Sequence, residues 1–155
     1  MKKIRIIAVG RFRAPHWQQA AASYRDKLRH AFSLEETIIK DGDASLGPAE
    51  RASAEGKRIL AALRPEEYVI CLDECGETRS SKAFADFLRK SLEETPPLCF
   101  IIGGAYGLAE EVLRRGNMLL SFGPMTFPRE LARVLLLEQI YRADNIQRNT
   151  PYHHA

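Results

Sequence analysis

The chain has 155 residues, a length that suits one domain able to bury a core without disulfides or metal. Its 45% hydrophobic and 28% charged residues are typical of a globular protein and exclude a disordered or fibrous chain. No apolar run approaches the roughly 20 residues of a membrane-spanning helix, and the amino terminus lacks a signal-peptide pattern. We therefore expect a cytoplasmic protein that does not enter a membrane.

The predicted elements alternate between strands and helices. In chain order we expect a strand at 4–9, a helix at 15–30, a strand at 34–39, a helix at 48–63, a strand at 68–72, a helix from about 81 to 92, a strand at 98–102, a short helix at 108–115, a strand at 118–120 and a long helix at 129–145. The polar, glycine-rich stretch 41–47 is expected to be a mobile loop. This alternation predicts an α/β fold in which a mostly parallel sheet carries helices on both faces, as a single domain over residues 1–155.

The three cysteines have no spacing that predicts a disulfide or a metal site. Cys71 and Cys99 lie in apolar runs of strand length and are expected to be small core residues, whereas Cys75 follows a strand and is expected to be exposed. A structural zinc site needs about four closely spaced ligands, so we expect no metal.

Glycines and polar residues follow three of the predicted strands, where ligands bind in open α/β sheets. The three segments are 72–74, 102–107 and 121–126. The glycines at 103, 104 and 107 do not have the spacing of a dinucleotide fingerprint, and the chain has no P-loop lysine. A loop of this kind is a tight turn more often than a ligand site, so the pattern leaves both roles open.

The long last helix is apolar around most of its circumference. Such a helix is buried on several sides, either by a partner subunit or by its own chain. Glu138 interrupts the apolar surface and lies four residues before Arg142, so the two can pair for structural or functional reasons. The polar tail that follows carries Tyr152, which can stack on a base, and His153, which can transfer a proton, although a terminus of this kind is usually frayed.

Four segments together resemble one protein family. They are Ile6-Ile7-Ala8-Val9-Gly10, the loop Ile101-Ile102-Gly103-Gly104-Ala105-Tyr106-Gly107, the helix pattern Met125-Thr126-Phe127-Pro128-x-x-Leu131-x-Arg133-Val134-x-x-x-Glu138-Gln139-x-Tyr141-Arg142-Ala143, and the tail Asn149-Thr150-Pro151-Tyr152-His153. The chain is similar over its whole length to the RlmH family, the SPOUT-class 23S rRNA pseudouridine N3-methyltransferases. The last third carries most of the specificity.

The resemblance implies an α/β fold with a C-terminal trefoil knot and a homodimer built on the last helix. It also implies methylation of N3 of pseudouridine 1915 in helix 69 of 23S rRNA, within the assembled ribosome (70S or 50S), with S-adenosyl-L-methionine as methyl donor. Related tails place Lys or Arg after the histidine, whereas this chain has His154-Ala155.

The resemblance also assigns residues to two parts of the site. The methyl donor is expected to contact Leu72, Gly103, Gly104, Phe122, Gly123, Pro124, Met125, Thr126 and Phe127. Tyr152 and His153 are expected at the target base, supplied by the other subunit, and Arg142 is expected to hold RNA or the tail.

The attacking nitrogen of pseudouridine must lose its proton during methyl transfer. His153 is the candidate for a base or for a group that stabilises the developing anion. Residues 1–30 hold eight basic residues and one acidic residue, so the helix around Arg25, Lys27 and Arg29 is a candidate for contact with RNA phosphates, although a solvated surface fits this charge equally well.

Three other functions stay open from the sequence. One is a SPOUT methyltransferase that acts on another RNA such as tRNA. A second is a ribosome-binding protein without chemistry, which the glycine loops argue against. A third is a flavodoxin-like nucleotide-binding protein, although the chain lacks its phosphate loop.

Overall fold

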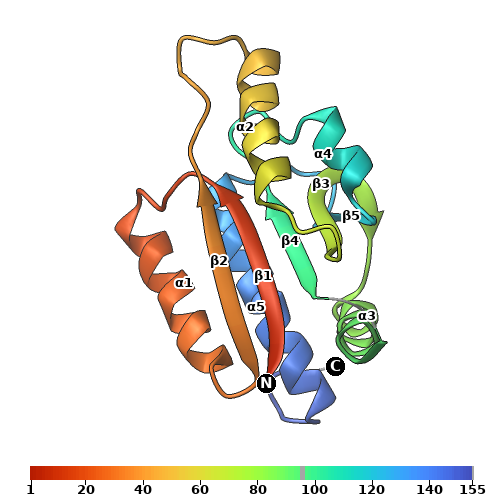
Figure 1. The fold of residues 1–155 in the computed structure, drawn as a ribbon. Helices are drawn as coiled ribbons and strands as arrows, with labels where there is room; N and C mark the ends of the chain where they lie inside the picture. Colours follow the sequence, from red (N-terminus) through yellow and green to blue (C-terminus); the bar gives the residue numbers. More distant parts are fainter. Residues whose placement is uncertain (95–96, 155) are drawn as a thin grey trace.

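A computed structural model of the chain describes residues 1–94 and 97–154 as a five-stranded sheet with helices on both faces (Figure 1). The elements in chain order are β1 (Lys2–Val9), α1 (Pro15–Leu28), β2 (Phe32–Ile39), α2 (Pro48–Ala62), β3 (Tyr68–Thr78), α3 (Ser81–Glu94), β4 (Leu98–Ile102), α4 (Glu110–Arg115), β5 (Met118–Ser121) and α5 (Arg129–Gln147). The strands lie in the order β2-β1-β4-β3-β5, and each pair of neighbours is parallel. The α/β class and the parallel sheet predicted from the sequence are therefore confirmed.

Strand β3 is the element whose length differs most from the prediction. After Leu72 the pairing with β5 is irregular, and both Leu72 and Glu77 lie opposite Leu120. The strand thus resumes after a bulge and continues to Thr78. The prediction of a strand ending at 72 was too short, because the polar residues of the bulge carry no alternating apolar pattern.

The side chains of β1 alternate between two cores, as expected for a strand buried on both faces. Ile4, Ile6 and Ala8 belong to the larger core, which includes buried residues of α1, α3 and α5. Ile7 and Val9 belong to the smaller core, which includes buried residues of α2 and α4. The helices are thereby divided between the two faces of the sheet.

Helix α5 is largely enclosed by its own chain. It lies against β4 and packs on α1 and α3, and seven of its residues are buried. The all-round apolar pattern is therefore explained in large part by packing within one chain. Leu131, Leu135, Tyr141 and Ile146 stay half-buried, so part of the apolar surface of this helix remains accessible to solvent.

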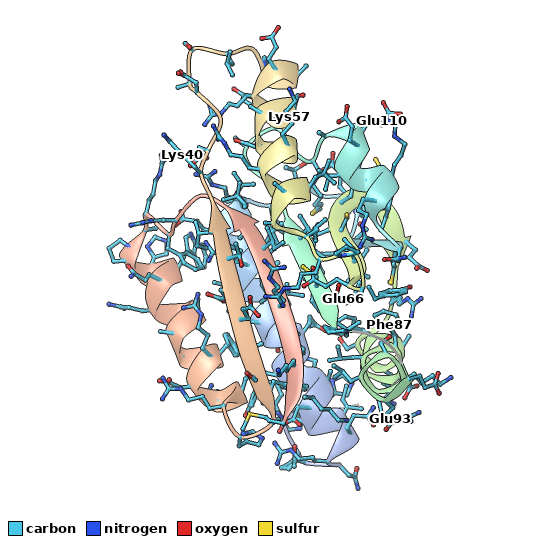
Figure 2. All side chains as sticks on the ribbon, in the orientation of Figure 1. Lys40, Lys57, Glu66, Phe87, Glu93 and Glu110 are labelled. Carbon is cyan, nitrogen blue, oxygen red and sulfur yellow. The ribbon has the colours of Figure 1, made fainter. Side chains whose placement is uncertain are left out.

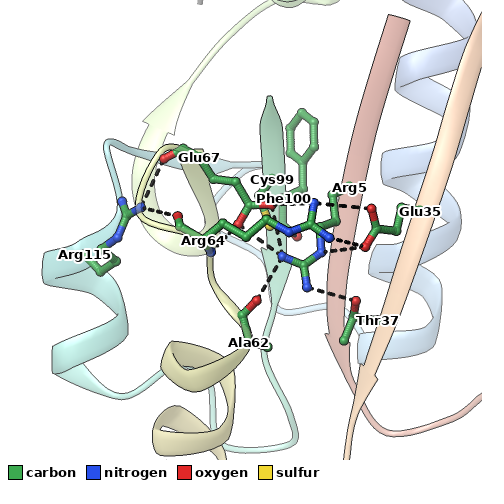
Figure 3. A network of polar contacts seen from close by, with 9 residues as sticks. All are labelled: Arg5, Glu35, Thr37, Ala62, Arg64, Glu67, Cys99, Phe100 and Arg115. Atoms are coloured by element: carbon green, nitrogen blue, oxygen red, sulfur yellow. Dashed lines mark hydrogen bonds and ion pairs between the residues drawn. The ribbon is translucent and has the colours of Figure 1, made fainter. Parts of the chain in front are cut away.

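A buried ion pair joins β1 to the segment between α2 and β3 (Figure 3). The Arg5 guanidinium donates to both carboxylate oxygens of Glu67, at 3.0 and 3.1 Å, and neither side chain is more than 8% exposed. Arg5 also donates to the Ala62 carbonyl and to Thr37, and Glu67 accepts from the Arg64 N–H. Several hydrogen bonds thus offset the cost of burying these two charges.

The cysteines lie where the sequence predicted. Cys71 and Cys99 are fully buried, and burial raises the pKa of these thiols to about 11 and about 12. Cys75 is exposed in the bulge of β3. Across residues 1–94 and 97–154, no three metal-ligating side chains are grouped so that they could hold an ion, and no helix is long and apolar enough to cross a membrane.

Candidate active site

Two loops meet at the carboxyl edge of the sheet and form a hollow of about 640 Å³, which we call the glycine hollow. One loop follows β4 and contributes Gly103 and Gly104, and the other joins β5 to α5 and contributes Thr126 and Phe127. The structure thus brings together four of the residues predicted to hold the methyl donor. A pocket of this size is within the range of small-molecule sites.

The other face of the β5–α5 loop borders a second hollow, of about 490 Å³, which we call the aromatic hollow. Phe122 and Gly123 line it, and Phe127 lines both hollows. The remaining walls come from the end of β3, the start of α3, and Leu135 and Gln139 of α5. The predicted donor residues are therefore divided between two adjoining hollows.

Three of the predicted donor residues line neither hollow. Leu72 is half-buried and packs against the larger core. Pro124 and Met125 are exposed on the β5–α5 loop, where 75% of Met125 is accessible to solvent. Their predicted role in donor binding stays a prediction.

Close approach explains two glycines of the glycine loop (103–107). The loop closes on itself through a hydrogen bond from the Gly107 N–H to the Gly104 carbonyl, at 3.2 Å. A Cβ atom on Gly103 would lie 2.9 Å from the backbone of Gly107, and one on Gly104 would lie 2.6 Å from an oxygen of the buried Glu55. Gly103 and Gly104 are therefore needed for the tight turn of this loop. Because they lack side chains, they also leave bare backbone at the wall of the glycine hollow.

The β5–α5 loop is fastened to the bulge of β3. The Ser121 hydroxyl lies within hydrogen-bond distance of the Gly123 and Glu74 carbonyls, at 2.9 and 3.1 Å, and its one proton can go to either. The Thr126 hydroxyl donates to the Glu74 carboxylate at 2.8 Å. These contacts hold the β5–α5 loop, on which six of the predicted donor residues lie, near the end of β3.

The C-terminal tail folds back on α5 through Glu138. One oxygen of the Glu138 carboxylate accepts from Arg142, at 2.6 and 3.0 Å, and from the Tyr152 hydroxyl, at 3.0 Å. The Arg142 guanidinium lies over the Tyr152 ring, and Tyr141 meets that ring edge-on. Asn149, with a φ of 53°, makes the turn that brings the tail back. The structure therefore brings Arg142, predicted to hold RNA or the tail, together with Tyr152 and His153, the two residues predicted for the target base.

A chain of hydrogen bonds connects the tail with the aromatic hollow. The Ser81 hydroxyl donates to the Gln139 side-chain oxygen at 2.9 Å, and the Gln139 amide donates to the other Glu138 oxygen at 2.8 Å. Ser81 and Gln139 line the aromatic hollow. The position of the tail is thereby tied to the wall of a pocket next to the β5–α5 loop.

The contact with Arg142 determines which nitrogen of His153 carries the ring proton. Arg142 Nη1 lies 3.2 Å from His153 Nδ1. Because a guanidinium only donates hydrogen bonds, Nδ1 is the acceptor and the proton of the neutral ring is on Nε2. Burial, with hydrogen bonds to Tyr24 and to the Glu138 carboxylate, holds the pKa of Tyr152 well above its ordinary value, so its hydroxyl stays protonated. The Tyr152 hydroxyl already donates to Glu138, so in this arrangement the Nε2–H of His153 is the donor that the pair can offer.

A group of arginines surrounds Asp41 beside the glycine hollow. Arg129 is hydrogen-bonded to the Asp41 carboxylate, and Arg13 and Arg51 lie 3.7 and 3.8 Å from it. Burial acts to raise the pKa of Asp41, but the hydrogen bond and the positive charge of Arg129 outweigh it, so the pKa lies below its usual value. The Gly42 N–H, the next residue, donates to Glu55 at 2.8 Å. The start of the stretch predicted to be mobile is therefore fastened to α2 and α5.

We expect Asp41→Asn to lower the free energy of unfolding by about 1 kcal/mol at neutral pH, because Arg129 loses a charged acceptor in a partly exposed pair. A depressed pKa stabilises the fold above the unfolded-state value of 3.8 and loses that effect as the pH falls. The difference between wild type and variant should therefore shrink below about pH 4. Urea unfolding at pH 7 and pH 3.5 checks this, and a difference independent of pH would contradict it.

Sequence reasoning did not single out several residues that build the site. Glu138 was noted only as a partner of Arg142, and the spacing gave no sign that it also holds Tyr152. Gln139, Ser81 and Glu74 act through contacts between distant segments, which no local pattern reveals.

The comparisons with known proteins agree with this geometry. The sequence model of a family described as "Predicted SPOUT methyltransferase" matches residues 1–153. A protein of Nitratidesulfovibrio vulgaris (strain DSM 19637 / Miyazaki F) named "Ribosomal RNA large subunit methyltransferase H" is 52% identical, covering 99% of this chain and 100% of its own. Proteins of the same name from Lawsonia intracellularis and Maridesulfovibrio salexigens are 52% and 42% identical, covering 99% and 100% of this chain and 98% and 100% of their own lengths.

A parallel α/β sheet with a glycine loop at its carboxyl edge and a full-length family match define a SPOUT-class methyltransferase. Within that class, the chain belongs to the RlmH family.

Proposed function

We propose that this protein transfers the methyl group of S-adenosyl-L-methionine to N3 of pseudouridine 1915 in helix 69 of 23S rRNA, on the assembled ribosome in the cytoplasm. The observation that carries the proposal is the meeting of the glycine loop and the β5–α5 loop in one hollow. The relatives named as methyltransferases of large-subunit rRNA support the choice of substrate. A single SPOUT domain over residues 1–155 would perform the reaction.

The residues at the two hollows fit a methyl donor of this kind. Gly103 and Gly104 bring bare backbone to the wall, and Phe122 and Phe127 offer apolar surface for an adenine and a thioether. When bound, S-adenosyl-L-methionine supplies an electrophilic methyl group. The role of the chain is to hold the donor in line with the attacking nitrogen, which by itself can account for much of the rate. No metal takes part in this proposal.

The tail is proposed to meet the target base in the site of the other subunit of a homodimer. Ala132 lines the glycine hollow, and Arg142 lies ten residues further along α5, or about 15 Å at the rise of a helix. The tail of the same chain is tied to the wall of the aromatic hollow, so the separation supports a partner's tail at the glycine hollow. The half-buried apolar residues of α5 are the surface proposed for the dimer.

A trefoil knot in the last third is part of the same proposal. The chain leaves the sheet at the edge strand β5 and returns beneath its middle, where α5 lies against β4. The return of α5 from the edge of the sheet to its middle supports the knot that the family resemblance implies.

His153 is proposed to act on the developing anion of the base. With the ring proton on Nε2, the imidazole can donate a hydrogen bond to an oxygen beside the attacking nitrogen and stabilise its negative charge. For His153 to accept the proton itself, Nδ1 must first leave Arg142. The observed contact therefore favours the stabilising role, with Glu138 holding Arg142 in place.

We expect Phe127→Ala to weaken binding of S-adenosyl-L-methionine at least about 10-fold, because Phe127 is the apolar wall shared by both hollows. Isothermal titration calorimetry checks this. Leu46→Ala is the matched control, since Leu46 is 39% exposed and Phe127 is 37% exposed. Equal affinities in both variants would remove the donor from these hollows, and no binding to the wild type would contradict the methyltransferase proposal.

The substrate is tested with tritium-labelled donor. Large ribosomal subunits, whole ribosomes, naked 23S rRNA and tRNA are each incubated with the wild-type protein. We expect label in ribosomal particles, at a single pseudouridine. Label in tRNA alone would show a SPOUT methyltransferase of different substrate, and binding to ribosomes without any label would show a protein without chemistry.

A further inference from the structure

We infer that the RNA backbone is held by a cationic surface at the carboxyl ends of β1 and β2, and not by helix α1. This inference rests on the proposed function and assigns the partner's phosphodiester groups to named residues. The surface, which we call the basic edge, consists of five exposed cations from three segments: Arg11, Arg13, Lys40, Lys57 and Arg58. Figure 2 shows Lys40 at the end of β2 and Lys57 on α2, at the same end of the molecule.

Three of these cations have no ion pair or hydrogen bond among the described residues. They are Arg11, Lys40 and Lys57, whose side chains are exposed. The Arg13 side chain is 74% exposed, and its guanidinium makes a long contact of 3.7 Å with Asp41. Arg58 is fixed, since its guanidinium donates to the carbonyls of residues 40 and 41, but it stays exposed. The positive charge of the basic edge is thus largely available to a partner.

The shape of the surface connects it with the proposed donor site. Arg11, Arg13, Lys40 and Arg58 line one hollow of about 780 Å³ at the ends of β1 and β2. Arg13 also lines the glycine hollow. A strand of nucleic acid lying in the basic edge would therefore pass beside the glycine loop, where the target nucleotide must be.

The carboxylates nearby are mostly engaged in contacts within the chain. Asp41 is hydrogen-bonded to Arg129, and Glu55 is buried and accepts from the Gly42 N–H. Glu130 accepts from the backbone N–H groups of residues 13 and 14. Asp43 is the exposed acid of the hollow, and its carboxylate accepts from Ser45. The hollow thus presents four cations against one acid that is not paired with an arginine.

The cations of α1 are occupied in a different way. Arg25 lies 2.8 Å from Glu36, and Arg29 lies 2.9 Å from Asp26. Lys27 lies over the rings of Tyr24 and Tyr141, at 5.1 and 5.4 Å. The sequence-based interpretation placed RNA phosphates on these three residues, but each is already engaged within the chain. A surface whose charges are unpaired attracts phosphates more strongly.

The test compares two triple variants that each remove three positive charges. Arg11→Gln/Lys40→Gln/Lys57→Gln removes the unpaired cations of the basic edge. The control, Lys3→Gln/Lys90→Gln/Arg114→Gln, removes three exposed cations from other elements, namely the start of β1, α3 and the end of α4. None of the three forms an ion pair with another described residue. Binding to purified large ribosomal subunits is measured between 50 and 200 mM KCl, a range over which counterion release changes affinity strongly. Binding of S-adenosyl-L-methionine is measured separately by calorimetry.

We expect the basic-edge variant to bind subunits at least about 10-fold more weakly at the low-salt end, with a salt slope shallower by about 2, since each phosphate contact contributes about 0.7 for single strands. Its donor affinity should equal that of the wild type, and the control should match the wild type in both measurements. If both variants bind subunits like the wild type, the inference is wrong while the proposed function stands. If the wild type neither binds the donor nor labels rRNA, the proposed function itself fails.

Two further probes separate RNA from other anions. Saturable binding of inorganic phosphate that is lost in the basic-edge variant, with unchanged binding to subunits, would show a site for a small anion and overturn the inference. Binding to phosphatidylserine vesicles that is lost in the basic-edge variant, with unchanged binding to subunits, would show a membrane-directed surface and would also overturn the inference.

Discussion

Replacing Arg5 with Met is expected to lower the free energy of unfolding by about 3–5 kcal/mol, because it leaves the Glu67 carboxylate buried without its cation. The Glu67 side chain is fully buried, and both of its oxygens accept from Arg5. For a chain of this size the loss corresponds to a fall in Tm of about 10 °C. Urea unfolding followed by far-ultraviolet circular dichroism measures the change.

The double variant Arg5→Met/Glu67→Leu separates a lost charge partner from lost packing. It removes both charges and keeps similar volume, so it should recover most of the stability lost in Arg5→Met alone. Arg64→Gln is the control for an exposed pair, because Arg64 and Glu35 are each about half exposed, and it should cost no more than about 1 kcal/mol. If Arg5→Met costs no more than Arg64→Gln, the buried pair does not stabilise the fold in the way that Figure 3 indicates.

This ion pair also shows where sequence reasoning about the fold stops. The strand 4–9 was predicted from its apolar residues, and that pattern gave Arg5 no partner. Its partner lies 62 residues away, and no local pattern connects the two. The alternation of strands and helices, by contrast, depends on periodicity within each element, which is why the parallel sheet could be predicted and the polar contact inside it could not.

The site divides in the same way. Ligands in parallel α/β sheets bind beyond the carboxyl ends of the strands. The meeting of Gly104 with the β5–α5 loop could therefore be predicted from the sequence. The role of the β3 bulge could not be predicted from the sequence, because Glu74 joins the site through contacts with the distant residues Ser121 and Thr126. The folding of the tail onto Glu138 also depends on the turn at Asn149, and a polar terminal segment gives no sequence signal for that turn.

The charge pattern shows a related limit. Counting eight basic residues in the first thirty pointed to an anionic partner, but it could not tell paired cations from free ones. In the structure Arg25 is paired with Glu36, whereas Arg11 has no such partner among the described residues. Because the α1 cations are paired, we expect the RNA contact at the loop before α1, where Arg11 lies, and not at α1 itself.

Replacing His153 with Ala is expected to reduce the turnover of rRNA methylation by about 100- to 10,000-fold, since that is the usual contribution of a group acting on a proton or a developing charge. Donor affinity should change little, because His153 lines neither the glycine hollow nor the aromatic hollow. Single-turnover methylation of large ribosomal subunits measures the rate. His154→Ala is the matched control, an exposed histidine one residue away without a partner among the described residues, and it should keep the wild-type rate. Wild-type turnover in the His153 variant would remove this residue from the chemistry.

His153→Gln then distinguishes the two roles of the imidazole. A glutamine amide can donate a hydrogen bond as the His153 Nε2–H does, but it cannot take up a proton at neutral pH. If His153 stabilises the developing anion while Arg142 holds Nδ1, as the 3.2 Å contact favours, the glutamine variant should recover part of the rate lost in His153→Ala. If His153 is the base, both variants should be equally slow, and the rate in both should rise steadily with pH as hydroxide and the imide's own ionisation take over removal of the proton.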